Sequence, residues 1–140
     1  FPPLADRLRV HGASVTVPHK EAAAAFAHRR SDRVISIGAA NTLHMVGHRW
    51  VGENTDVDGF LVPLSQMLNR AEISLNGLPT VVIGAGGAAR AAAAALVESG
   101  TDLWIANRTL ERARTLARMF GLGADRAVSL ETVATVLRRY

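Results

Sequence analysis

The segment TVVIGAGGAARAAAAALVESG, residues 80–100, constrains the fold more than any other part of the sequence. An apolar run from Val81 to Ile83 leads directly into the glycine turn GAGGAA, and an alanine-rich stretch follows up to Gly100. The turn matches the pattern G-x-G-x-x-G/A, which is weak evidence alone but strong between a strand and a helix. A strand, a glycine turn and a helix in this order predict a dinucleotide-binding α/β unit.

Each small residue of this turn has a predicted role. Gly84 permits the tight bend, Gly86 lets the backbone approach a pyrophosphate, and Ala89 allows the helix to pack close to the strand. The pyrophosphate would lie at the helix N-terminus, where backbone N–H groups lack partners within the helix. A turn of small residues that serves packing alone is the alternative interpretation. The predicted phosphate-binding residues are Gly84, Ala85, Gly86, Gly87 and Ala88.

The end of the next expected strand indicates which nucleotide binds. NAD-binding domains usually place Asp or Glu there, to bind the ribose 2′-OH. This chain has Asn107, Arg108 and Thr109 instead, with Arg112 one helical turn later. Guanidinium and hydroxyl groups can bind a 2′-phosphate, which a carboxylate would repel. Two arginines at a helix start are unfavourable unless an anion is bound, so the sequence favours NADP over NAD, with two solvated arginines as the alternative.

Helices and strands alternate through the second half of the chain. A helix is expected from Asp58, and it has to place Pro63 near its first turn. The elements expected after the glycine-turn helix are a strand within 101–109, a helix over 110–121, a strand at 127–130 and the start of a helix in 131–140. This alternation predicts a parallel, doubly wound sheet. Residues 58–140 are therefore expected to form a partial Rossmann-type NADP-binding domain.

The first half of the chain has a different pattern. SVTVP, residues 14–18, alternates β-branched residues and predicts a short strand. Residues 19–30 predict a helix with an acidic first turn and arginines at its end. Two short strands are expected on either side of Gly47. We expect residues 1–57 to form a partial substrate-binding α/β domain.

Lys20 stands out because it is the only lysine among the 16 Lys and Arg residues of the chain. Arginine stays protonated in ordinary protein sites, whereas a lysine can exchange its proton when the site favours the neutral amine. Lys20 is therefore the candidate acid–base residue, and His19 is the alternative. Side chains of neighbouring residues at a helix start diverge, so only one of the two can face a site. A surface lysine without a chemical role is the simpler interpretation.

Charge and composition argue against several classes of partner. The net charge of +4 raises nucleic acid as a partner, but the arginines are scattered among acidic residues without a basic run. The absence of cysteine excludes disulfides, thiolate metal sites and cysteine nucleophiles. The other histidines show no paired metal-ligand spacing, and no apolar run approaches the roughly 20 residues that span a bilayer. We expect no nucleic-acid, membrane or metal partner, and a cytoplasmic location.

Together these motifs resemble those of the shikimate dehydrogenase family. VTVPHK at 15–20 is similar to the family's VTxPHK, GAANT at 38–42 to GAxNT, and GENTDVDG at 52–59 to G-x-NTD-x-x-G. The segments GAGGAAR and NRT complete the set in the family's order and spacing. Five ordered motifs over about 100 residues are far more specific than any one of them alone.

The resemblance implies reversible, NADPH-dependent reduction of 3-dehydroshikimate to shikimate, a step of aromatic amino-acid biosynthesis. Lys20 would match the catalytic lysine, which exchanges a proton with the oxygen that becomes the alcohol. Asp56 would match its carboxylate partner. The residues themselves agree with this chemistry, because hydride transfer from a cofactor to a carbonyl carbon requires one proton donor and precise positioning.

The resemblance also implies substrate-binding residues. Thr16 and Asn41 would match residues that hold the ring hydroxyls or carboxylate, and Ser14 and Thr55 are weaker candidates. Ser14 replaces an Asn that is common in the family, which leaves the choice among related cyclohexane acids open. Asp32 would lie near the nicotinamide, by its spacing alone.

Two other functions stay open from the sequence: a quinate or other shikimate-like dehydrogenase, and a non-catalytic NADP-binding module that would need neither Lys20 nor Asp56. The resemblance also implies family members about twice as long as this chain. They have a serine pair before the equivalent of Phe1 and a C-terminal helix with a glutamine near the substrate. We therefore expect the chain to be part of a longer enzyme. The sequence leaves the oligomeric state open, with a homodimer as one option.

Overall fold

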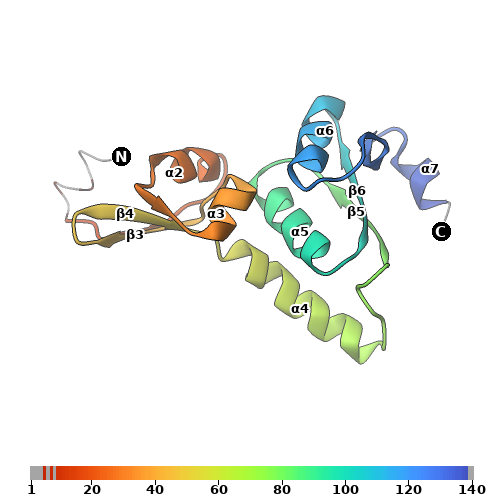
Figure 1. Cartoon of the computed structure of the whole chain (residues 1–140), viewed down its shortest axis with the longest axis horizontal. Coiled ribbons are helices and arrows are strands. Elements are labelled where there is room, and N and C mark those ends of the chain that lie inside the picture. The colour runs from red at the N-terminus through yellow and green to blue at the C-terminus, as the bar shows by residue number, and fades with distance from the viewer. Residues whose placement is uncertain (1–4, 6, 8, 139–140) are drawn as a thin grey trace. The chain divides into compact units, whose positions relative to one another are not determined.

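Two sheets organise the chain, one in each of its two units, Phe1–Thr55 and Asp56–Tyr140 (Figure 1). The computed structural model describes residues 5, 7 and 9–138. The second unit opens with a helix that begins at Asp56. The boundary expected after residue 57 therefore falls in the first turn of this helix.

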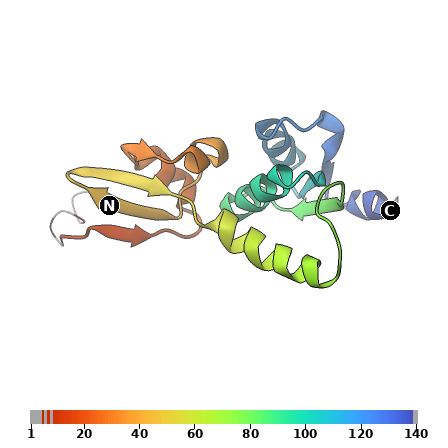
Figure 2. The same cartoon turned by 60° about the horizontal axis from the view of Figure 1, so that its bottom comes forward.

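The first unit contains a four-stranded mixed sheet with the order β1-β3-β4-β2. The strands β1 and β4 run antiparallel to β3, and β2 runs parallel to β4. The hairpin of β3 and β4 (Figure 2) confirms the two strands expected around Gly47, which adopts a φ of +62° at the turn. The described elements are β1 (Gly12–Ser14), α2 (Lys20–Phe26), β2 (Arg29–Arg30), α3 (Asp32–Ile37), β3 (Thr42–Val46) and β4 (Arg49–Glu53).

The strand expected over 14–18 is wrong in its extent, because only its first residue belongs to β1. The chain turns after Thr16, where the N–H of His19 donates to the Thr16 carbonyl oxygen at 2.9 Å. Pro18 has no N–H with which to continue a ladder. Val17, which the alternating pattern placed in the strand, is 69% exposed.

The helix expected over 19–30 is also too long. The structure ends α2 at Phe26, and the backbone of Ala27 is already extended. The following residues instead form β2, which pairs with β4. The helix α3, which starts after its cap residue Ser31 and ends at the left-handed Gly38, is not among the elements expected from the sequence. A serine directly before an acidic first turn, and a glycine after the last turn, are typical signals for such a short helix.

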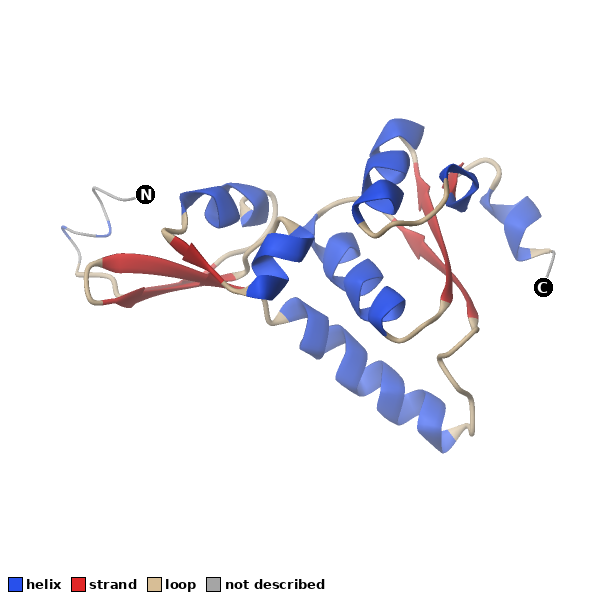
Figure 3. Cartoon of the chain, viewed as in Figure 1, coloured by secondary structure: helices blue, strands red, loops and turns tan. Residues whose placement is uncertain are grey.

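The second unit is built on a parallel three-stranded sheet with the order β5-β6-β7. Figure 3 shows helices and strands alternating along this part of the chain. This is the Rossmann-type α/β arrangement that the sequence predicts. The elements are α4 (Asp56–Arg70), β5 (Pro79–Ile83), α5 (Gly87–Glu98), β6 (Asp102–Asn107), α6 (Leu110–Met119), the short 3-10 helix η1 (Ala124–Arg126), β7 (Ala127–Ser129) and α7 (Val133–Leu137).

The core of this unit is formed by small and aliphatic side chains. Leu103 and Ile105 of β6 pack with Leu96 of α5 and Leu116 of α6. The other buried residues of α5 are alanines, which let neighbouring elements approach the helix backbone closely because they project little beyond it. The alanine-rich helix therefore provides a close-packed layer beside the sheet.

The helix α4 begins two residues before the expected Asp58 and contains Pro63 in its interior. The prediction that Pro63 lies near the first turn is therefore wrong. A proline at this position removes the backbone hydrogen bond to residue 59. Gly59 and Pro63 are both exposed, so water can satisfy the carbonyl group that is left. Neither α4 nor any other helix in the described part of the chain is long and apolar enough to cross a membrane.

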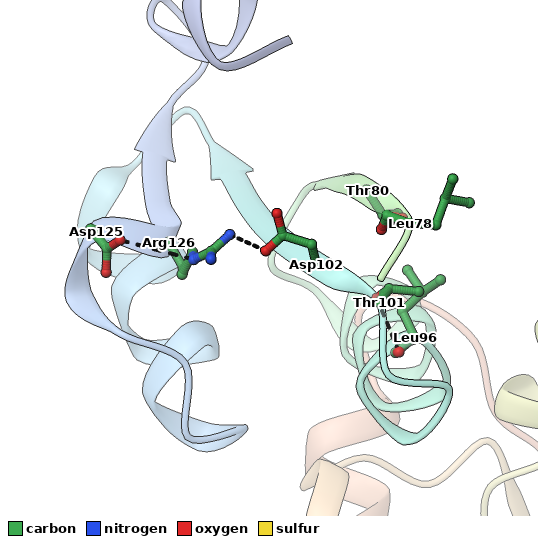
Figure 4. A network of polar contacts seen from close by, with 7 residues as sticks. All are labelled: Leu78, Thr80, Leu96, Thr101, Asp102, Asp125 and Arg126. Carbon is green, nitrogen blue, oxygen red and sulfur yellow. Dashed lines mark hydrogen bonds and ion pairs between the residues drawn. The ribbon is translucent and has the colours of Figure 1, made fainter. Parts of the chain in front are cut away.

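Polar contacts at the start of β6 join it to η1 and to the preceding helix α5 (Figure 4). The guanidinium of Arg126 donates to the carboxylate of Asp102 and lies 4.8 Å from the ring centre of Trp104. The hydroxyl of Thr101 donates to the Leu96 carbonyl oxygen at 3.0 Å. These contacts hold the start of β6 against both α5 and η1.

Candidate functional site

One end of the first sheet brings together most of the predicted substrate residues. Ser14 is the last residue of β1 and pairs in register with Thr42 of β3. One residue further, the Val15 N–H donates to the Asn41 carbonyl oxygen at 2.7 Å. Thr55 lies just beyond the end of the neighbouring strand β4. The predicted residues near this end of the sheet are Ser14, Thr16, Asn41 and Thr55.

Asn41 and Thr55 are joined by two hydrogen bonds. The Asn41 Nδ2 donates to Thr55 Oγ1 at 2.9 Å, and the Thr55 backbone N–H donates to Asn41 Oδ1 at 3.0 Å. The hydroxyl of Thr42 also donates to Asn41 Oδ1 at 3.0 Å. Because a backbone N–H can only donate, these contacts set which way the amide of Asn41 faces. Two predicted substrate residues therefore form one oriented polar pair.

Lys20 begins α2 beside the same end of the sheet. Its carbonyl oxygen accepts a hydrogen bond of 2.8 Å from the Ala40 N–H, next to Asn41. His19 precedes it as the N-cap residue of α2, without a side-chain cap bond. Asp56, the predicted partner of Lys20, follows Thr55 directly and is the first residue of α4 in the second unit. The pairing of Lys20 with Asp56 stays a prediction.

A groove of about 530 Å³ lies in the first unit, beside β1 and α2. Its lining residues are Ala13, Ser14, Val15, Thr16, His19, Ala22, Ala23, Phe26 and Leu43. Most of this lining is apolar, which does not suit a ring that bears hydroxyls and a carboxylate. The polar groups at the end of the sheet are therefore the better candidates for contact with such a substrate.

In the second unit, the glycine turn has the geometry that the sequence predicts. Gly84 adopts a φ of +125°, and its N–H donates to the Ala106 carbonyl oxygen at 2.7 Å. A Cβ on Gly84 would lie 3.6 Å from the Cβ of Ala89, so the first turn of the helix packs closely on the strand end. The positive φ explains why this position needs glycine.

Gly86 has a different explanation. It is the N-cap residue of α5 with a φ of −90°, a conformation that other residues adopt freely. A Cβ at this position would meet no atom of the described residues within 4 Å. Neither backbone strain nor internal packing requires glycine here. The predicted role of Gly86 is to let a phosphate approach the free N–H groups at the helix start, and this role stays a prediction.

The NRT segment lies at the same edge of the sheet as the glycine turn. The strands β5 and β6 are parallel neighbours, with Ile83 opposite Ala106, so the residues that follow both strands meet at their carboxyl ends. The side chain of Asn107 donates to the Thr109 carbonyl oxygen at 2.9 Å. Thr109 is the N-cap residue of α6, but its hydroxyl makes no cap bond.

Arg108 and Arg112 are exposed beside this edge. No other described residue forms an ion pair or a side-chain hydrogen bond with either guanidinium. By contrast, Arg114 on the same helix pairs with Glu111 at 2.5 Å. Cations near a helix N-terminus are unfavourable without an anion, so this arrangement fits the 2′-phosphate of NADP.

Asp32 lies apart from this set in the chain. It is an exposed first residue of α3 in the first unit, whereas the other predicted cofactor residues all belong to the second unit. Its contact with the nicotinamide stays a prediction.

Comparison with known proteins agrees with both halves of this description. The family model described as "Shikimate / quinate 5-dehydrogenase" matches residues 66–140. The chain belongs to the shikimate dehydrogenase family. A second model of this family, described as the shikimate dehydrogenase substrate binding domain, matches residues 3–43.

Individual members of the shikimate dehydrogenase family are similar over most of the chain. Shikimate dehydrogenase (NADP(+)) of Thermus thermophilus is 46% identical over 125 residues, which cover 89% of this chain and 44% of that protein. A solved structure of the Thermus thermophilus enzyme in complex with NADP(H) and shikimate has a TM-score of 0.71 at 43% identity, covering 87% of this chain and 46% of that chain. Shikimate dehydrogenase from Aquifex aeolicus has a TM-score of 0.84 at 33% identity, with coverages of 98% and 48%. The chain thus spans about half the length of these family members.

Asn54, a residue of the family's NTD motif, is not among the site residues expected from the sequence. The structure buries it to 4% exposure, and it is the one polar residue among the buried ones in the described part of the chain. The alternation of β4 contains the signal. Trp50 and Gly52 are buried, and continuing the period of two places Asn54 on the same inward face.

Proposed function

We propose that the protein containing this chain catalyses the reversible reduction of 3-dehydroshikimate to shikimate with NADPH. The main support is the oriented pair of Asn41 and Thr55 at the sheet end beside the start of α2 at Lys20. A module that binds only a nucleotide has no use for these residues. Relatives named shikimate dehydrogenase (NADP(+)) give further support.

The residues of the second unit are suited to hold NADP. The backbone from Gly84 to Ala88 would receive the pyrophosphate, and the turn of Asn107 to Thr109 with Arg112 would receive the 2′-phosphate. The open space beside Gly86 supports this assignment. Bound NADPH supplies the hydride.

The residues of the first unit are suited to orient the substrate and supply the proton. Lys20 would donate a proton to the oxygen that becomes the alcohol and recover it in the reverse direction. Asp56 would orient this lysine. Ser14, Thr16, Asn41 and Thr55 would hold the ring substituents. In this proposal residues 1–57 bind substrate and residues 58–140 bind NADP.

A quinate-like activity is the second candidate, because the matching family model includes quinate dehydrogenases by its description. Ser14, where the resemblance implies an Asn in many members, is a position at which the two substrates could be distinguished.

A substrate panel tests the proposal directly. The full-length protein is assayed in the oxidative direction with shikimate, quinate and other cyclic hydroxy acids, each with NADP and with NAD. We expect the highest kcat/KM with shikimate and NADP. A preference for quinate would favour the second candidate. Nucleotide binding without turnover of any acid would show that the protein is a binding module.

A further inference from the structure

Asn54 occupies an unusual position for a polar side chain. It follows the last residue of β4 and is buried, and its Nδ2 donates to the Ala39 carbonyl oxygen at 2.9 Å. Removing this donor would leave the carbonyl group of buried Ala39 without this partner, and an unsatisfied buried group costs more than an average hydrogen bond contributes. This contact therefore ties the end of β4 to residue 39 more firmly than an exposed contact would.

Ala39 belongs to the GAAN segment, residues 38–41, which contacts several parts of the candidate site. The next residue, Ala40, donates its N–H to the Lys20 carbonyl oxygen at 2.8 Å. Asn41 donates its N–H to the Glu53 carbonyl oxygen at 3.1 Å. Its own carbonyl oxygen accepts from the Val15 N–H. A displacement of this segment would therefore move Asn41 and the start of α2 together.

The contacts of Asn41 with Thr55 are themselves exposed. Exposed polar pairs compete with water, and a hydrogen bond in the low-dielectric interior is stronger. The exposed pair therefore relies on neighbouring buried contacts to keep its geometry. The bond from Asn54 is a buried side-chain contact that links the same two stretches of chain, residues 39–41 and 53–55.

We propose that Asn54 is a positioning residue of the active site, acting through the GAAN segment to set the orientation of Asn41 and the first turn of α2 at Lys20. The expected effect on kinetics rests on the proposed function. Its structural part, the anchoring of residues 39–41, holds whatever the substrate is.

The test compares two buried substitutions, one within β4 and one at the residue that follows it. Asn54→Leu keeps the approximate size and removes the donor without burying a charge. Trp50→Leu removes packing at the opposite end of β4, where Trp50 is 4% exposed and contributes to the core of the first unit. Both variants are made in the full-length protein, and their thermal unfolding is measured first, so that kinetics are compared well below both transitions.

We expect Asn54→Leu to lower kcat/KM for the acid by about 10- to 100-fold. This is the range found in metal sites when a hydrogen bond that orients a ligand residue is removed. The dissociation constant for NADP should stay within about twofold, because all the predicted nucleotide residues except Asp32 lie in the second unit. Trp50→Leu should lose stability and keep kcat/KM. Equal kinetic losses in the two variants, in proportion to their loss of stability, would overturn the proposal.

A double variant tests whether Asn54 acts through Asn41. If it does, adding Asn54→Leu to Asn41→Ala should lower kcat/KM much less than it does in the wild-type background, since residues that share one function are not additive. Full additivity would contradict the proposed route.

Hydrogen exchange supplies a readout that does not depend on activity. The backbone amides of Ala40 and Asn41 donate to Lys20 and Glu53. Because local opening governs hydrogen exchange, these two amides should exchange at least about tenfold faster in Asn54→Leu than in the wild type. Their exchange rates should not change in Trp50→Leu. Unchanged exchange would refute the anchoring itself, whereas faster exchange in a protein without shikimate turnover would refute only the proposed function. Asn54→Ala replaces the leucine variant if that variant does not fold.

Discussion

Lys20 is the residue on which the proposed chemistry depends most. We predict that Lys20→Arg lowers turnover by roughly 10²–10⁴, the usual contribution of general acid–base catalysis. Arginine keeps the positive charge and much of the reach, but it does not readily give up a proton near neutral pH. Substrate affinity should therefore survive in part, and NADP affinity should stay close to wild type. Steady-state kinetics and a nucleotide titration on the full-length protein measure these quantities.

Asp56→Asn serves as the partner experiment. It should give a similar loss and should not add fully to Lys20→Arg, because two groups that act as one unit give non-additive losses. Near wild-type turnover in the Lys20→Arg enzyme would mean that the lysine supplies only charge. His19 or a water molecule would then have to supply the proton.

Close packing explains why Gly52, the first residue of the GENTDVDG motif, is a glycine. A Cβ at this position would lie 3.0 Å from the Cβ of Ala27 and 3.4 Å from the Cβ of Ala40. We predict that Gly52→Ala lowers the free energy of unfolding by about 1–3 kcal/mol through overpacking. Urea denaturation measures the change.

Gly59→Ala is the matched control in the same motif. It lies within α4, and its added Cβ would meet no described atom within 4 Å outside the helix's own backbone. Alanine is favoured over glycine in a helix by about 0.5–1 kcal/mol, so this variant should be slightly more stable. A Gly52→Ala protein as stable as the wild type would show that β4 and its neighbours can move apart at no cost.

At the level of elements, the part of the second unit from β5 to α5 follows from short-range patterns, whereas the end of α2 depends on long-range pairing. The run from β5 through Gly84 into α5 was predictable because a strand, a positive-φ turn and a helix follow one another within one segment. The end of α2 was not, because β2 exists only by pairing with β4, some 20 residues later in the chain. The alternation of β4 predicts the burial of Asn54, but it does not predict the partner of this side chain, because Ala39 belongs to a distant segment.

A further prediction concerns the edge formed by the carboxyl ends of β5 and β6. Replacing Arg108 and Arg112 with alanine should weaken NADP binding and barely change NAD binding. Each lost charge-assisted contact should cost about 1.5–3 kcal/mol. Isothermal titration of both nucleotides with the full-length protein measures the difference.

The helix α6, which contains Arg112, provides the control for this experiment. Arg114→Ala with Arg118→Ala removes the same charge from α6 further along the helix, including the arginine that pairs with Glu111. This double variant should leave the ratio of NADP to NAD affinity near its wild-type value. Equal losses for the two nucleotides in the Arg108 and Arg112 variant would exclude a 2′-phosphate clamp.

At the level of the whole molecule, the motifs and their order predict the family and a chain of two parts. The shape of the first unit was less predictable, because its sheet mixes parallel and antiparallel pairing between distant segments. The parallel sheet of the second unit follows from regular alternation, which leaves few other topologies.

A final prediction concerns residues 1–140 expressed alone. Among the described strands of the second unit, β5 is an outer strand, and its last residue Ile83 is 66% exposed. An outer strand with exposed apolar side chains pairs readily with another chain. We therefore predict concentration-dependent association and little or no turnover, even where nucleotide still binds. Sedimentation velocity across a range of concentrations measures the association.

Two lysine substitutions separate the strand edge from a general effect of charge. Ile83→Lys places a charge at the exposed end of β5 and should shift the association to higher concentrations, as lysines do on natural edge strands. Gln66→Lys adds the same charge on the exposed surface of α4 and should change the association little. Equal shifts in both variants would mean that net charge alone keeps the chains apart. A monomer at all concentrations, with full activity, would show that the outer strand β5 requires no further cover.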